Sequence, residues 1–162
     1  VAFEALKFLK QKSMKFELIL QGAGWEIYRD QLINLDIPYT ILNYSSKKES
    51  DEFFKRIDVF LCTSDYEGGP LPVLEAMASG IPVVSTEVGI AKEILINGGG
   101  LLCKKGNSKQ IAIALKELID NKELYAVHSD KAIENIKQLD WANLKEEYAF
   151  MYDRFSLENY KE

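Results

Sequence analysis

The chain has 162 residues, of which 47% are hydrophobic and 28% charged, so it is long enough to bury the core of one domain. Its formal net charge of −5 argues against a nucleic-acid-binding protein, which would need a basic surface to offset phosphate charge. No apolar run approaches the roughly 18 residues of a membrane span, and no signal-peptide pattern opens the chain.

Apolar residues recur at helical spacing from the first residue, over residues 1–9. The chain begins with Val1 and already within this helical pattern, so we expect it to be a fragment of a larger protein. In chain order the pattern then predicts strand 16–20, helix 25–35, strand 38–42, a helix from Ser46 to about 56, strand 59–62, helix 71–79, strand 82–84, helix 91–96, strand 101–103 and helix 108–120. Two further helices are expected at 122–138 and 143–157.

Five short apolar strands that alternate with helices indicate an α/β fold. We expect a Rossmann-like, doubly wound and mostly parallel sheet covered on both faces, with extra helices at the C-terminus. The two cysteines, Cys62 and Cys103, lie in apolar runs without a C-x-x-C spacing. We interpret them as reduced core residues of a cytoplasmic protein.

The stretch EGGPLPVLEAMASGIPVVS, residues 67–85, joins a glycine-rich loop to a helix that begins near Leu71. In a doubly wound sheet, ligands bind beyond the carboxyl ends of the strands, which is where this loop lies. Free backbone N–H groups at the start of the helix favour an anion, and we expect these donors to be Gly69, Leu71, Val73 and Leu74. Adjacent glycines also let the backbone approach a ligand closely.

Two carboxylates, Glu67 on the loop and Glu75 one turn into the helix, flank this anion site. They suit a phosphate flanked by hydroxyl groups, with Glu75 accepting hydrogen bonds from a ribose diol and Glu67 from a sugar, which together describe a nucleotide-sugar. A structural alternative is equally open from these residues alone. In it, Glu75 is an N-terminal helix charge worth about 0.3–1 kcal/mol, and Glu67 is a solvated loop residue.

The spacing of Glu67 and Glu75, continued by AMASGIPVV over residues 76–84, closely resembles the E-x7-E signature of retaining GT-B glycosyltransferases. The nearest match is glycosyltransferase family 4, also called group 1. Three other segments resemble motifs of that family: residues 18–24, residues 57–64, and residues 89–94 together with 100–102. The resemblance covers about residues 1–155 and is much more specific than a lone glycine pattern.

This resemblance implies two Rossmann-like domains that face each other across a cleft, with the donor on the C-terminal one. It implies that Glu67 is the catalytic residue, which holds the transferred sugar near its reacting carbon, and that Glu75 binds the ribose hydroxyls. The other implied donor-binding residues are Gly22, Asn43, Tyr44, Ser45, Gly68, Gly69, Pro70 and Leu71. We therefore expect residues 1–162 to be a single donor-binding domain, truncated at its N-terminus and lacking the acceptor-binding domain.

Three departures from the family pattern matter for the site. Pro70 and Pro72 replace residues that often supply N–H groups, and Asn43 stands where the family usually has glycine. The family's phosphate-binding Arg and Lys lie just after the first strand of the domain, a point that precedes Val1. We therefore expect the isolated chain to fold without transferring sugar.

The expected function is transfer of a sugar from a nucleotide-sugar to a saccharide or lipid-linked acceptor, in cell-surface polysaccharide biosynthesis. No D-x-D motif occurs, so we expect no metal and no cofactor. The expected location is the cytoplasm, with peripheral association of the full-length protein at the inner face of the membrane. Two alternatives remain at this point: a GT-B nucleotide-sugar 2-epimerase and a non-catalytic nucleotide-binding module.

Overall fold

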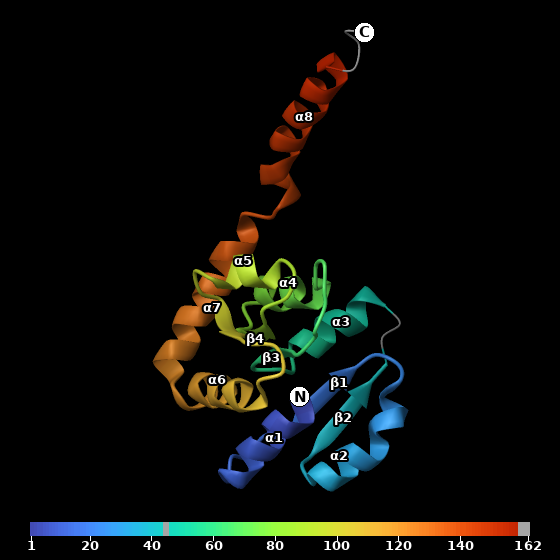
Figure 1. The fold of residues 1–162 in the computed structure, drawn as a ribbon, viewed down its shortest axis with the longest axis vertical. Coiled ribbons are helices and arrows are strands. Elements are labelled where there is room, and N and C mark those ends of the chain that lie inside the picture. The colour runs from blue at the N-terminus through green and yellow to red at the C-terminus, as the bar shows by residue number, and fades with distance from the viewer. Residues whose placement is uncertain (44–45, 159–162) are drawn as a thin grey trace.

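The computed structural model describes residues 1–43 and 46–158, and its five strands form two parallel sheets (Figure 1). The strands are β1 (Leu18–Gln21), β2 (Tyr39–Leu42), β3 (Phe60–Cys62), β4 (Val83–Thr86) and β5 (Gly100–Cys103). β1 pairs with β2, and β4 lies between β3 and β5. The α/β class and the parallel strands are as predicted. One continuous sheet is expected from the sequence. In the structure β1 and β3 do not pair, so the described strands form two separate sheets.

Helices connect the strands and continue beyond the last one. They are α1 (Ala2–Gln11), the 3-10 helix η1 (Trp25–Tyr28), α2 (Arg29–Leu35), α3 (Lys47–Phe54), α4 (Leu71–Ala78), α5 (Ala91–Leu95), α6 (Ser108–Asp120), α7 (Lys122–Lys137) and α8 (Trp141–Glu158). The side chains of Ser46, Asn107 and Asn121 accept a hydrogen bond from the backbone N–H three residues ahead. These caps fix where α3, α6 and α7 begin.

Side chains that alternate along the strands build two cores, one on each face of the sheets. On one face, Val84 and Cys103 pack with buried residues of α1 and α6. On the other face, Val83 packs with buried residues of α3, α4, α5 and α7. Each core also includes hydrophobic side chains of both sheets, so the helices hold the two sheets together on both faces.

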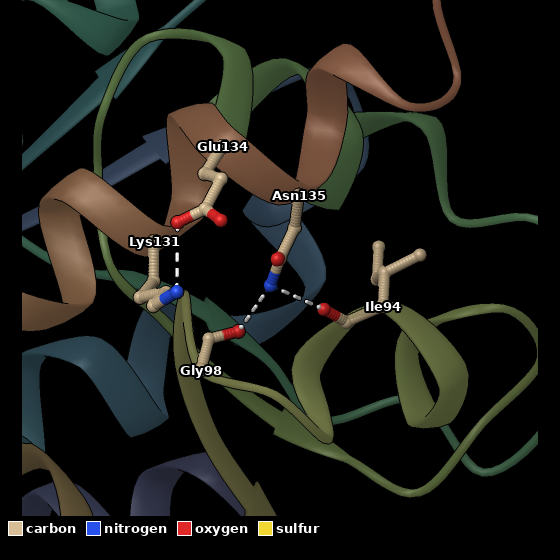
Figure 2. A network of polar contacts seen from close by, with 5 residues as sticks. All are labelled: Ile94, Gly98, Lys131, Glu134 and Asn135. Carbon is tan, nitrogen blue, oxygen red and sulfur yellow. Dashed lines mark hydrogen bonds and ion pairs between the residues drawn. The ribbon is translucent and has the colours of Figure 1, made fainter.

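Helix α7 is fastened to the loop that leads into β5 (Figure 2). The amide Nδ2 of Asn135 donates to the carbonyl oxygens of Ile94 and Gly98, each at 3.0 Å. Beside it, Lys131 forms an exposed ion pair with Glu134 at 2.7 Å. Because Asn135 satisfies two loop carbonyls, it ties the end of α5 and the approach to β5 to one helix.

Helix α8 extends away from the rest of the molecule (Figure 1). It exposes five large aromatic side chains: Trp141, Tyr148, Phe150, Tyr152 and Phe155. Within the described residues, no helix combines the length and the apolar composition needed to cross a membrane.

Candidate functional site

The predicted Glu67 lies on the loop that joins β3 to α4, at the carboxyl end of its strand. Its carboxylate Oε1 accepts a hydrogen bond from the Ser64 hydroxyl at 2.9 Å. Ser64 is fixed in turn, because the hydroxyl of the fully buried Thr86 donates to its carbonyl oxygen at 2.6 Å. The chain of contacts from Thr86 to Ser64 to Glu67 anchors the exposed carboxylate to β4.

A close backbone contact from the next loop holds the same segment. Gly89 has a φ of +45°, and a Cβ placed there would lie 2.3 Å from the Gly68 carbonyl oxygen and 2.5 Å from that of Glu67. The Ile90 N–H also donates to the Gly68 oxygen at 3.3 Å. Only glycine permits both the positive φ and this approach, so Gly89 locates the backbone of the Glu67 loop.

The sequence alone does not mark Thr86 or Gly89 as site residues. Gly89 lies in a segment that resembles a family motif, and its contact joins two loops that are about 20 residues apart. The one available signal is a glycine in the loop that follows a buried strand, three residues after Thr86. Thr86 carries no signal, because a threonine in a strand is ordinary.

Glu67 and Glu75 face two hollows that adjoin each other. Glu67 lines a pocket of about 290 Å3 beside β3. Glu75, one turn into α4, lines a larger cavity of about 1230 Å3 that continues between the two sheets. Thr63 and Pro72 line both, so they mark the boundary between the hollows. The structure therefore places both predicted carboxylates on one rim of the molecule, the edge beyond the carboxyl ends of the strands, and each carboxylate lines its own hollow.

The first turn of α4 supplies fewer free donors than expected. The prediction that Val73 offers a free N–H is wrong, because this group donates to the Pro70 carbonyl at 2.9 Å. Pro70 is buried and is the N-cap residue. Because proline has no backbone N–H, it can border a ligand but cannot donate a hydrogen bond to it. The side chain of Leu71 is 67% exposed at the start of the helix.

The two loop glycines are open to an approaching ligand. Gly68 and Gly69 are exposed, and a Cβ built on either would meet no atom within 4 Å. Space is therefore available for a ligand at the backbone of this loop, as the glycine pair predicts.

The remaining predicted donor residues lie on the neighbouring sheet. Gly22 follows β1 with a φ of +111° and lines the same large cavity as Glu75. Asn43 follows β2, is exposed and borders neither hollow. Tyr44 and Ser45 lie outside the described residues. The structure thus brings Gly22 to the rim with the two glutamates and leaves Asn43 one strand further away.

Tyr66, next to Glu67, is 89% exposed, and the Lys105 ammonium lies 4.8 Å from the centre of its ring. Lys105 comes from the turn after β5, so this cation–π contact spans the rim above β4. It leaves a positive charge near the loop that carries Glu67.

The buried cysteine, Cys103, is not placed to react. Both cysteines are free; Cys103 is buried and Cys62 is partly buried. Burial, followed by the nearby charge of Glu87, raises the pKa of the Cys103 thiol to about 11, which keeps it protonated. In the described part of the chain, no three His, Cys, Asp or Glu side chains gather as a metal site would require. This observation does not test whether the site works without a metal, so the metal-free site stays a prediction.

Comparison with known proteins places this rim in a family context. The family model described as "Glycosyl transferases group 1" matches residues 1–138. An uncharacterised glycosyltransferase of Methanocaldococcus jannaschii is 28% identical over 135 residues, which cover 82% of this chain and 38% of the relative. The amylovoran biosynthesis glycosyltransferase AmsK of Erwinia amylovora is 33% identical over 129 residues, which cover 73% of this chain and 32% of the relative.

A solved structure shares the fold. The Anabaena protein HepE, crystallised in complex with UDP and glucose, superimposes with a TM-score of 0.75 at 20% identity, covering 93% of this chain and 44% of that one. The chain therefore spans less than half the length of these relatives and of this structure.

Proposed function

The chain belongs to the glycosyl transferases group 1 family, and on that premise we propose that it is the donor-binding domain of a retaining glycosyltransferase. In this proposal a nucleotide-sugar lies along the rim formed by the loop after β3 and the first turn of α4. Its sugar passes to a saccharide or lipid-linked acceptor, which a separate part of the longer protein binds.

The observation that carries the proposal is the pair of adjoining hollows with one glutamate in each. Glu75 accepts hydrogen bonds from the ribose diol in the larger hollow, and Glu67 faces the sugar in the smaller one. The diphosphate between them lies at the α4 N-terminus, where the helix dipole favours negative charge. The open backbone at Gly68 and Gly69 gives it close access.

The proposed chemistry separates the roles of the two carboxylates. The bond between the anomeric carbon and the diphosphate oxygen breaks, a bond to the acceptor hydroxyl oxygen forms, and the hydroxyl passes its proton to the departing diphosphate oxygen. Positive charge develops on the sugar as the old bond weakens, and the Glu67 carboxylate stabilises it in the transition state. The α4 N-terminus stabilises the departing diphosphate, and the proposal uses no bound metal.

We extend the proposal to assembly of cell-surface polysaccharide at the inner face of the membrane. It rests on the names of relatives, which include amylovoran and colanic acid biosynthesis enzymes and an O-antigen chain mannosyltransferase. The exposed aromatic face of α8 is compatible with docking onto the acceptor-binding part of the longer protein.

Two variants of the full-length protein test the proposal. Glu75→Gln should weaken binding of UDP or GDP, measured by calorimetry without magnesium, by roughly 1–3 kcal/mol, because charged hydrogen bonds are lost. Glu67→Ala should leave that affinity within a few-fold but sharply reduce transfer, because its partner is the sugar.

Glu123→Gln, on the exposed start of α7, is the control and should change neither quantity. Normal turnover in a folded Glu67→Ala protein would leave Glu67 a loop residue. Unchanged binding of both UDP and GDP by Glu75→Gln would remove the ribose assignment.

A further inference from the structure

Two buried hydroxyl groups stand at the carboxyl end of β4. In the described part of the chain the buried polar residues are Ser50, Ser85 and Thr86, and the last two complete this strand. Threonine and valine both carry two heavy atoms on Cβ, so a valine would fill the position of Thr86 without a hydroxyl to satisfy. Because a buried hydroxyl needs a hydrogen-bond partner, the partner of Thr86 indicates what this side chain does.

That partner is a carbonyl oxygen of the loop that carries Glu67. The register between β3 and β4 ends with the pair Cys62 and Ser85, after which the chain leaves β3 for this loop. One residue further along β4, the Thr86 hydroxyl donates to the Ser64 carbonyl oxygen at 2.6 Å. A hydroxyl has a single proton, so this bond uses the whole donor capacity of the side chain. Thr86 thereby holds the departing loop two residues beyond the end of β3.

Thr86 is itself fixed by its surroundings. It lies opposite Cys103 of β5 in the sheet register. Its carbonyl oxygen accepts hydrogen bonds from the Val88 N–H at 2.8 Å and from the Ser85 hydroxyl at 2.9 Å. Its side chain is fully buried, and a β-branched side chain has few rotamers to choose from. The sheet therefore sets the position of the hydroxyl, and the hydroxyl sets the position of Ser64.

Ser64 passes this order on to the Glu67 carboxylate. The Ser64 hydroxyl donates to Oε1 of Glu67 at 2.9 Å, so the other carboxylate oxygen, Oε2, is the one left for a ligand. Ser64 and Glu67 both line the pocket of about 290 Å3, whereas Thr86 lines neither hollow. Thr86 therefore cannot touch a sugar in that pocket. Any effect of Thr86 on such a sugar has to pass through the two residues that it holds.

We propose that Thr86 is a positioning residue for sugar transfer. Acting through Ser64, it holds the Glu67 carboxylate with Oε1 bonded to the protein and Oε2 directed at the sugar. This inference rests on the proposed function, in which Glu67 stabilises the charge that develops on the sugar. Because that charge appears only as the donor bond breaks, the Thr86 hydroxyl contributes to turnover and not to donor binding.

Thr86→Val in the full-length protein removes the hydroxyl and keeps the shape of the side chain. We expect kcat to fall about tenfold or more, since a displacement of about 1 Å at a reacting group can cost about 100-fold. Turnover is measured as nucleoside diphosphate released from UDP-glucose, UDP-N-acetylglucosamine or GDP-mannose. KM for the donor, and the affinity for UDP or GDP by calorimetry, should stay within about twofold. Thr86→Ser keeps a hydroxyl and should recover most of the turnover. An unchanged kcat in Thr86→Val would overturn the proposal.

Ser64→Ala tests the same link at a partly buried position, where the core is left intact even if Thr86→Val does not fold. It removes the hydrogen bond to Glu67, so kcat should fall while the affinity for UDP or GDP stays within about twofold. A Ser64→Ala protein with normal kcat would overturn the proposal, because the path from Thr86 to the carboxylate runs through Ser64.

A double-mutant cycle with Glu67→Ala separates this inference from the proposed function. If Thr86 acts through Glu67, adding Thr86→Val to Glu67→Ala should lower the residual turnover by less than about twofold. A further tenfold loss would show another route and overturn this inference alone. Normal turnover in Glu67→Ala itself would overturn the proposed function.

Thr40→Val is the matched control, because it makes the same substitution on β2. The Thr40 hydroxyl also bonds a carboxylate, donating to Oε1 of Glu17 at 2.7 Å, but Thr40 lines neither hollow. Turnover should therefore stay unchanged in Thr40→Val. If Thr40→Val and Thr86→Val lowered kcat alike, the loss would not depend on Glu67, and the proposal would be wrong.

Discussion

The strands β2 and β4 have similar lengths and comparably apolar sequences, yet they differ in burial. All four residues of β4 are buried, whereas β2 alternates between exposed and partly buried residues. The difference lies in their neighbours, because β4 has a strand on each edge and core-forming helices on both faces, while β2 pairs with β1 alone. Burial in a parallel sheet is therefore a property of the position that a strand occupies.

The same contrast divides the candidate site. Glu67 and its supports Thr86 and Gly89 belong to the β3–β4–β5 sheet, where buried hydrogen bonds and backbone contacts hold them. Gly22 and Asn43 belong to the β1–β2 pair, where a Cβ added at Gly22 would meet nothing within 4 Å. The loop that carries Glu67 is thus held by a buried hydrogen bond and a close backbone contact, and no such contact is seen at Gly22.

Among the substitutions that test this comparison, Gly100→Ala in β5 should lower the free energy of unfolding most. The new Cβ would lie 2.0 Å from the Val83 carbonyl oxygen, so β4 and β5 would have to separate. We expect the free energy of unfolding, measured by urea titration, to fall by about 3 kcal/mol or more. Gly22→Ala, in open space but at a positive φ, should cost only about 1–2 kcal/mol. Equal losses would remove the distinction between the two regions.

A second substitution acts on the loop that carries Glu67 and rests on the proposed function. Gly89→Ala would force the backbone of the Glu67 loop to move, since two carbonyl oxygens lie within 2.5 Å of the new Cβ. A displacement of about 1 Å at the reacting group can reduce turnover roughly 100-fold, and we expect a loss of that size in full-length kinetics.

Gly106→Ala is the matched control, because Gly106 also has a positive φ, +73°, but has no atom within 4 Å of the added Cβ. Both variants carry backbone strain, and only Gly89→Ala should alter turnover. If both reduced turnover alike, general strain rather than the position of the loop would be the cause.

The smallest effect should come from Asn135→Ala, which removes the two hydrogen bonds shown in Figure 2. The carbonyls of Ile94 and Gly98 would lose their partner, so the free energy of unfolding should fall by about 1–2 kcal/mol. Glu134→Ala breaks only an exposed ion pair with Lys131 on the same helix, and should cost less than about 0.5 kcal/mol. A thermal melt of each variant distinguishes the two results.

Much of this fold could be predicted from local sequence. The helix expected at 108–120 is α6, and the strand expected at 59–62 is β3 with one residue fewer. Gly80 has the positive φ, +72°, that suits a glycine after a helix. These features depend on periodicity and on residues close in sequence, so a single sequence carries them.

The other features depend on contacts between distant segments. Hydrophobic spacing counts strands but does not say which edges meet, so it predicted one sheet where β1 and β3 are apart. The helix expected at 25–35 begins as a 3-10 turn after Gly24, where no side chain caps it. Of the site, the positions of Glu67 and Glu75 on one rim followed from the motif, whereas the donation of the Val73 N–H to Pro70 depends on local geometry that the motif does not specify.

The contact between Gly89 and the Gly68 carbonyl joins main chain to main chain, with no side chain between them. Substitutions at Asp65 and Tyr66, both exposed beside Glu67, can therefore accumulate in related sequences without shifting the carboxylate. Under the proposed function, such a loop can diversify in the sugars that it accepts while its chemistry stays constant. Among related sequences, substitutions should concentrate at Asp65 and Tyr66, and Gly89 should stay unchanged.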